Sequence, residues 1–313
     1  MKTPFKILTG ILITLSLPLN GLVFSDILID IDLTEEESGP AETILNTGSL
    51  EGDFEAEFDI PSIETLDGVN AVTLDGNNDW YIGPDASPLT GNTDRSVEAW
   101  VWNPSVPSEE TIFAWGRRGG PDASNFSMLY GNHPSYGALG AWGGNADMPF
   151  YPGGGAPEPN EWHHLVLTYN SQSNERSIYV DGELTNSENN GSFFDTHEFD
   201  DTGLALPMVI GNQNEPNGTR TDALSADLSI AKIKVHDTVL TESDVLDSFN
   251  LDKIKFGKGG PEIISFEASE NTIGPDETVT FTWEIDGAET IYIDNDIGDV
   301  SDIEEIAVSY THL

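Results

Sequence analysis

The stretch "SVEAWVW", residues 96–102, has the alternating pattern of a β-strand with two different faces. Successive side chains of a strand point to opposite sides of its sheet. One face therefore carries the small apolar side chains of Val97, Ala99 and Val101, and the other carries Glu98 and two tryptophans. The segment predicts a β-strand, and the rest of the chain repeats this kind of pattern.

Only one segment, "TESDVLDSF" (241–249), looks helical, with Thr241 as N-cap and Asp244 as the partner of a short capping box. Strands without crossover helices between them favour an all-β protein built as a two-sheet antiparallel jelly-roll sandwich. Besides residues 96–102, we expect strands within 27–33, 70–83, 111–116, 163–170, 176–184, 207–213 and 228–237.

Acidic residues dominate the composition. The chain has 55 Asp and Glu against 12 Lys and Arg, a formal net charge of −43. Such a charge disfavours nucleic acid and anionic membrane surfaces as partners. It fits either solubility in a salty exterior or binding of divalent cations. There are no cysteines, which excludes disulfides, thiol catalysis and thiolate metal sites.

The N-terminal segment 1–25 has the features of a secretory signal peptide: two lysines, an apolar run and a cleavage pattern before Asp26. We therefore expect a secreted protein, extracellular or on the cell surface, whose mature chain does not insert into a membrane. Residues 26–255 form the expected jelly roll, the Gly- and Lys-rich stretch 256–260 a linker, and 261–313 a second, smaller β module.

Seven segments occur in an order that resembles laminin-G-like (concanavalin A-like) jelly-roll domains of bacterial secreted proteins. The most specific pair is Trp162-His163-His164 with Tyr179-Val180-Asp181-Gly182. The resemblance covers residues 26–255 and implies two curved antiparallel sheets with a role in extracellular recognition, often of glycans. The segments are "VTLDGNNDWYI", "SVEAWVW", "TIFAWG", "EWHHLVLTYN", "IYVDGEL", "VIGNQ" and "IAKIKVHDTVLTESDV".

The tail, 261–313, resembles bacterial immunoglobulin-like modules of the pattern P-x-I-x-S-F…G-x-x-V-x-F-x-W, although it has Glu277 in place of the usual glycine. An immunoglobulin-like domain takes about 100 residues, so the tail is an incomplete module, and we expect the chain to be a fragment of a longer protein. The matching residues are Pro261, Ile263, Ser265, Phe266, Val279, Phe281 and Trp283.

Catalytic motifs are missing from the sequence. Glycosidases of this fold carry E-x-D-x-x-E on one strand, and no predicted strand has this triplet; no G-x-S-x-G elbow occurs either. We therefore expect a binding module that is not an enzyme and requires no cofactor. Two alternatives stay open: a glycoside hydrolase relative with unrecognised carboxylates, and a structural spacer of a surface protein.

The loop "DGNND" (75–79) is a candidate calcium site, because Asp75, Asn77 and Asp79 offer the oxygen ligands that Ca²⁺ prefers. The alternative is a hairpin turn in which Asn and Asp bond to their own backbone. In the related domains a second source of oxygen ligands lies on a late strand, where this sequence has Ala231 and Lys232 instead of acids.

Aromatic and basic residues between positions 115 and 155 predict a site for a glycan or cell-surface polysaccharide. Sugars pack on aromatic rings, and glycine-rich loops allow a close approach of the ligand. Trp100, Trp102 and Trp115 fit packing positions in the sheets equally well. The candidate ligand-binding residues are Arg117, Arg118, Tyr130, His133, Tyr136 and Trp142.

The adjacent arginines of "FAWGRRGGPD" (113–122) leave two interpretations open. One arginine pairs with Glu98 and stacks on a tryptophan as a structural unit, or one faces the groove and recognises a carboxylate or sulfate. Alternation along the strand puts Arg117 on the side of Trp115 and Arg118 on the opposite side.

Overall fold

The protein is described by a computed structural model that covers residues 26–143 and 146–260, together with 262–270, 274, 277–286, 288, 291–293, 297–301 and 303–309 of the tail. The expected signal peptide, residues 1–25, and Pro261 lie outside the described residues. No helix in the described ranges has the length and apolar character needed to cross a bilayer.

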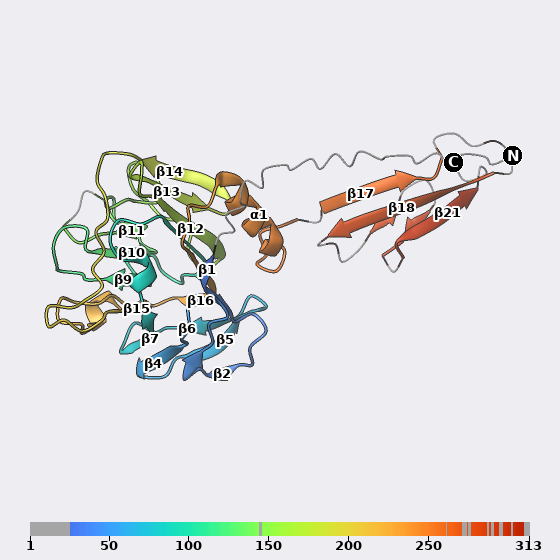
Figure 1. Ribbon diagram of the computed structural model, residues 1–313. Coiled ribbons are helices and arrows are strands. Elements are labelled where there is room, and N and C mark those ends of the chain that lie inside the picture. The colour runs from blue at the N-terminus through green and yellow to red at the C-terminus, as the bar shows by residue number, and fades with distance from the viewer. Residues whose placement is uncertain are drawn as a thin grey trace, which may run out of the picture.

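Residues 26–236 fold into two antiparallel β-sheets, which confirms the all-β expectation and is consistent with a jelly-roll sandwich (Figure 1). The nine-stranded sheet runs in the order β14 (Glu183–Glu188), β13 (Glu175–Val180), β12 (Trp162–Asn170), β8 (Arg95–Trp102), β16 (Ser229–His236), β6 (Val69–Thr73), β5 (Ser62–Leu66) and β2 (Gly39–Pro40), with β1 (Ile27–Asp32) also paired to β16.

The seven-stranded sheet forms the other layer of the sandwich. Its order is β11 (Leu139–Gly140), β10 (Asn125–Leu129), β9 (Thr111–Gly116), β15 (Pro207–Ile210), β7 (Asp79–Asp85), β4 (Phe54–Phe58) and β3 (Thr43–Ile44). Short 3-10 helices lie at Ser87–Leu89 and Asp222–Leu224.

The two faces predicted for residues 96–102 are both buried in β8. Val97, Ala99 and Val101 belong to the main core, which also contains Phe113 and Trp115 of the other sheet. The burial of these apolar side chains from both sheets supplies the main favourable contribution to folding.

The opposite face of β8 is covered by α1 (Glu242–Asp252) and the turn after it. Trp100 stacks on Phe256 with 4.0 Å between ring centroids. The capping box predicted for this helix is present, since Asp244 N donates to Thr241 Oγ1 and the Asp244 carboxylate accepts from Thr241 N.

The segment assigned to a linker, 256–260, begins as part of the sandwich. Phe256 is buried against Trp100, and Lys258 Nζ forms ion pairs with Glu161 Oε2 (3.2 Å) and Asp181 Oδ2 (3.3 Å). The Gly-rich composition did not reveal these contacts, because they are made with residues far away in the sequence.

Glu98 does not pair with an arginine, and the structural unit proposed for Arg117 or Arg118 with Glu98 is wrong. The strand β8 that carries Glu98 lies in one sheet, while β9, which the arginines follow in a turn, lies in the other. Glu98 instead accepts hydrogen bonds from His164 Nε2 (3.2 Å), His236 Nε2 (3.0 Å) and Ser248 Oγ (2.6 Å).

The described part of the tail forms a separate antiparallel sheet of β17 (Glu262–Ala268), β18 (Thr278–Asp286) and β21 (Glu305–Ser309), with the small pair β19 (Tyr292–Ile293) and β20 (Gly298–Asp299). The rings of Phe266 and Phe281 stack across β17 and β18 at 5.5 Å. The tail is therefore a β module, and its immunoglobulin-like character stays a prediction.

Candidate functional site

The candidate site is a pocket on the seven-stranded sheet, on the face turned away from the core. On β10, Phe126 and Met128 point into the core, while Asn125 and Leu129 line the pocket. The pocket has a volume of about 210 Å³ and is lined by Glu109, Arg118, Asn125, Leu129, Tyr136, Gly140, Ala141, Trp142, Gly143, Asp147 and Gln213.

The floor of the pocket is a hydrogen-bonded polar network. Asn125 Oδ1 accepts from the backbone N–H of Trp142 (2.7 Å), and Asn125 Nδ2 donates to Gln213 Oε1 (3.2 Å). Gln213 Nε2 donates in turn to Thr111 Oγ1 (3.1 Å). Because Asn125 and Gln213 are buried and satisfied, they fix the position of the Trp142 backbone.

Two glycines shape the loops around the pocket. Gly116 ends β9 with φ +81°, and a Cβ there would lie 2.5 Å from Ser124 O. Gly143 has φ +60°, and a Cβ there would lie 2.3 Å from Asp122 Oδ1. Glycine is needed at position 116, because the left-handed conformation and the close backbone of Ser124 exclude a side chain. At position 143 the left-handed conformation favours glycine, although the Asp122 carboxylate could move aside.

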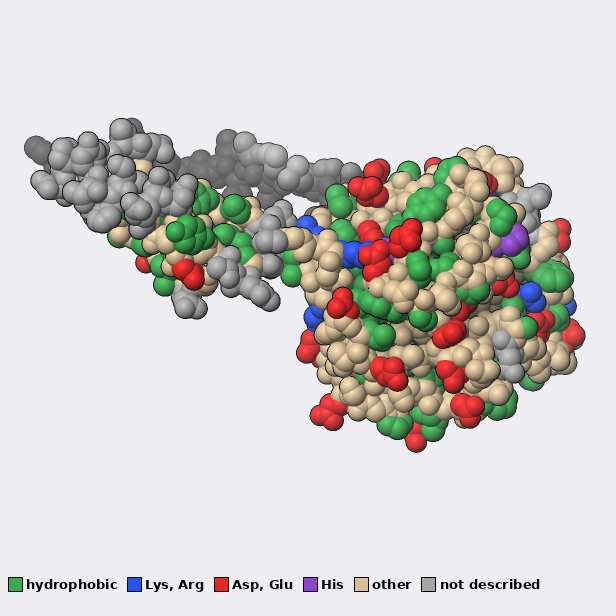
Figure 2. Space-filling view, turned by 180° about the vertical axis from the view of Figure 1, so that it is seen from behind, with side chains coloured by type: hydrophobic (Ala, Val, Ile, Leu, Met, Phe, Trp, Pro, Cys, Tyr) green, Lys and Arg blue, Asp and Glu red, His purple; other side chains and the backbone are tan. Residues whose placement is uncertain are grey.

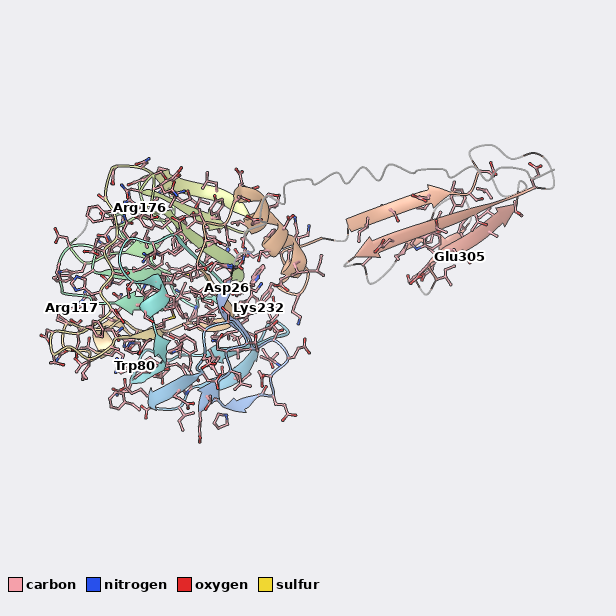
Figure 3. The ribbon with its side chains drawn as sticks, viewed as in Figure 1. Asp26, Trp80, Arg117, Arg176, Lys232 and Glu305 are labelled. Atoms are coloured by element: carbon pink, nitrogen blue, oxygen red, sulfur yellow. The ribbon has the colours of Figure 1, made fainter. Side chains whose placement is uncertain are left out.

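Only one of the two adjacent arginines lines the pocket. Arg118 Nη1 pairs with Glu215 Oε1 at 3.0 Å, and its guanidinium lies over the Trp142 ring at 5.4 Å. Arg117 does not line the pocket, and its Nε is buried without a hydrogen-bond partner among the described residues. Figure 3 places Arg117 at the edge of the sandwich opposite α1.

The predicted aromatic residues divide into pocket and core. Trp142 is 42% exposed and lines the pocket together with Tyr136. The rings of His133 and Tyr136 stack at 3.4 Å, so His133 supports Tyr136 without lining the pocket itself. Tyr130 is the correction: it is fully buried in the core, and its hydroxyl donates to Glu158 O (3.1 Å).

The pocket also contains two carboxylates that sequence reasoning missed, Glu109 and Asp147. Burial raises the pKa of Asp147 to about 6, with the charge of Glu109 acting in the same direction. Burial and these two acids also raise the pKa of the Tyr136 hydroxyl. No motif joins positions 109 and 147, and only the fold of the loops brings them to one pocket.

The candidate calcium loop connects the two sheets, since β6 and β7 lie in different layers and form no hairpin. Asp75 Oδ1 accepts from Asn77 N (2.9 Å), and Asp79 accepts from Asp75 N. Burial raises the pKa of Asp79 to about 7. In the described part of the chain no group of three or more acids and histidines is arranged to hold a metal, and calcium binding at this loop stays a prediction.

The described geometry can be compared with known proteins. Residues 75–246 match the family described as the concanavalin A-like lectin/glucanases superfamily, laminin G type 3. The chain belongs to this superfamily. The match includes β7 to β16, the first part of α1 and the whole pocket, whereas the tail lies outside it.

One similar solved structure is domain 4 of a GH43 extracellular arabinanase from Geobacillus stearothermophilus, in complex with arabinotriose. It has 15% sequence identity and a TM-score of 0.46, and the match covers 71% of this chain and 98% of that chain. The binding domain of botulinum neurotoxin serotype G has 12% identity and a TM-score of 0.47, covering 73% of this chain and 51% of that one. A Trypanosoma rangeli sialidase in complex with sialic acid has 16% identity and a TM-score of 0.44, covering 72% and 32%. No curated protein matches.

Proposed function

We propose that residues 26–255 form a non-catalytic carbohydrate-binding module whose site is the pocket beneath Trp142. The module serves adhesion or substrate targeting within a larger extracellular protein. The observation that carries this proposal is the exposed indole of Trp142, held by Arg118 beside Tyr136 over a satisfied polar floor.

This arrangement suits a sugar. The apolar face of a pyranose or furanose ring packs on an aromatic ring, and its hydroxyls exchange hydrogen bonds with carboxylates and amides. Trp142 and Tyr136 supply the aromatic surface, and Glu109 and Asp147 supply acceptors. The floor of Asn125 and Gln213 holds Trp142 before the ligand arrives, which reduces the entropy cost of binding.

The pocket also bears on the two alternatives. A structural spacer would need no groove lined by tryptophan, tyrosine and arginine, so the pocket supports binding over a spacer role. A glycosidase would need two carboxylates at one cleft, and Glu109 and Asp147 are such a pair, with the pKa of Asp147 raised to about 6. Hydrolysis is therefore the second candidate function.

The test is a glycan-array screen of the full chain, with and without Ca²⁺, followed by affinity measurements on the bound glycans. We expect Trp142→Ala to weaken binding at least ~10-fold, equivalent to about 1.4 kcal/mol. Phe199→Ala is the matched control, because Phe199 is exposed to a similar extent (46%) and lies outside the pocket.

The arginine pair provides a second internal control. Arg118→Ala is expected to weaken binding, while Arg117→Ala leaves it unchanged. Absence of binding to every neutral and acidic glycan would refute the proposal. Release of new reducing ends from a bound oligosaccharide, abolished by Asp147→Asn, would identify a hydrolase instead.

A further inference from the structure

The charges around the pocket are unevenly paired. The guanidinium of Arg118, the only basic residue that lines the pocket within the described ranges, is already neutralised by Glu215 at 3.0 Å. Glu109 makes no hydrogen bond or ion pair with the other described residues, although it is half-buried at the pocket wall. The pocket therefore contains a carboxylate that has no partner among the described residues.

Asp147 adds a second acceptor that is only partly satisfied. Its Oδ1 accepts from the backbone N–H of Ala141 (2.7 Å), which leaves Oδ2 without a hydrogen bond from the described residues. The charge of Arg176 acts on Asp147, but Arg176 is buried and forms an ion pair with Glu188 at 3.4 Å. Because Arg118 and Arg176 each form an ion pair with a glutamate, they do not neutralise Glu109 and Asp147. The pocket therefore has a net negative charge.

Half-buried carboxylates without partners are unfavourable, because burial removes part of their hydration. A ligand that brings a positive charge and several N–H donors to this point relieves that cost. A ligand that brings a carboxylate or sulfate increases it, since the oxyanion would have to displace Glu215 from Arg118 and approach two like charges.

We propose that this pocket selects oligosaccharides that carry a protonated amine, with a sugar ring on Trp142 and the ammonium group between Glu109 and Asp147. The inference rests on the proposed carbohydrate-binding function and specifies its substrate class as amino sugars. It replaces the expectation that an arginine here recognises an acidic polysaccharide, because the arginine is already engaged and the unpaired charges are negative.

The surface as a whole does not account for this selectivity. Acidic side chains are scattered over the face seen in Figure 2, so any cation is attracted weakly and without specificity. A site-specific preference must therefore depend on Glu109 and Asp147, and on the aromatic surface beside them. These requirements separate the proposal from general electrostatic attraction.

The test compares two ligands that differ only at the amine: a β-1,4-linked glucosamine pentamer and its fully N-acetylated form. At mildly acidic pH and physiological salt, where most amines of the glucosamine pentamer are protonated, we expect the full chain to bind the amine form at least ~10-fold more tightly. Glu109→Gln and Asp147→Asn should each reduce this preference several-fold. Glu64→Gln, an exposed acid on β5, is the matched control and should leave it unchanged.

Acidification offers a second readout that does not depend on a variant's folding. Protonation of Asp147 below its pKa of about 6 should weaken binding of a fully N-trimethylated pentamer, whose positive charge does not titrate, while binding of the acetylated pentamer persists. Charged groups that face Asp147 are Glu109 and Arg176, with Glu188 paired to the latter.

The outcomes are distinguishable. Equal affinity for the two pentamers, or tighter binding of the acetylated one, would overturn the amine inference and leave the proposed function standing. Equally tight binding of pentalysine would show that the site binds any cationic chain, including a peptide, and would also overturn the amine inference. Failure of both pentamers and of every other glycan to bind would refute the proposed function itself.

Discussion

Replacing the buried carboxylate of Glu98 tests how the sandwich holds α1. Glu98 accepts from His164, His236 and Ser248, and Lys234 Nζ lies 3.8 Å from its Oε1. Burial raises the pKa of Glu98, but the hydrogen bonds from the histidines and the charge of Lys234 outweigh burial and hold that pKa well below 4.5. The perturbation is Glu98→Gln, which keeps the shape and removes the charge.

The expected loss follows from the partners. The amide of glutamine presents an NH₂ group to at least one of the three donors, so one or two buried N–H or O–H groups lose their acceptor. A hydrogen bond to a charged group contributes about 1.5–3 kcal/mol, and breaking a buried charge pair costs about 3–5 kcal/mol. His164 Nδ1 is already buried without a partner in the described part of the chain, which limits compensation by a change of tautomer. We expect Glu98→Gln to lower the free energy of unfolding by about 3 kcal/mol.

Urea unfolding at neutral pH, followed by tryptophan fluorescence, measures this loss as a shift of the midpoint at an unchanged slope. Because the folded-state pKa of Glu98 lies below its unfolded value, its contribution is present above about pH 4.5 and is lost as the pH falls through the folded pKa. The difference between the two proteins should therefore shrink in acid. If Glu98→Gln were as stable at neutral pH as the exposed control Glu64→Gln, the stabilising role of the hydrogen bonds to Glu98 would be refuted.

Three further changes have defined outcomes. Burial raises the pKa of Asp79 to about 7, so its negative charge destabilises the fold increasingly as the pH rises above about 4. The variant Asp79→Asn should therefore be more stable than the unmodified protein by up to ~4 kcal/mol at about pH 8, and equally stable near pH 4. Thermal melts in EDTA check this, and a Ca²⁺-dependent rise in Tm that Asp79→Asn abolishes would support the calcium prediction instead. Arg95 is fully buried, donates to Gly91 O (2.8 Å) and Thr93 O (2.9 Å), and lies 5.5–5.7 Å from four aromatic rings. Because Arg95→Met loses these contacts, we expect it to lower the free energy of unfolding in urea by about 3 kcal/mol. A loss below about 1 kcal/mol would contradict a stabilising role of Arg95. Arg118→Ala breaks a half-exposed ion pair and should change stability by less than about 1 kcal/mol, and a larger loss would make Arg118 a structural residue.

The sequence determined the features that depend on neighbours along the chain. Period-2 alternation predicted that Val97, Ala99 and Val101 share a face, and they meet in the core. The capping box of α1 was predictable because Thr241 and Asp244 are three residues apart and bond to each other's backbone. Alternation does not extend to Arg117 and Arg118, because β9 ends at Gly116 with φ +81°, and the turn after it brings Arg118 to the pocket.

The tertiary structure decided what depends on the partners of each strand. Sequence alternation says which side chains share a face, but not which sheet lies beside it, so Glu98 was paired with an arginine of the other layer. For the same reason Phe256 was assigned to a linker although it stacks on Trp100. The joint placement of Glu109 and Asp147 in one pocket was also out of reach, because local sequence patterns carry no information about contacts that form only when distant loops pack together.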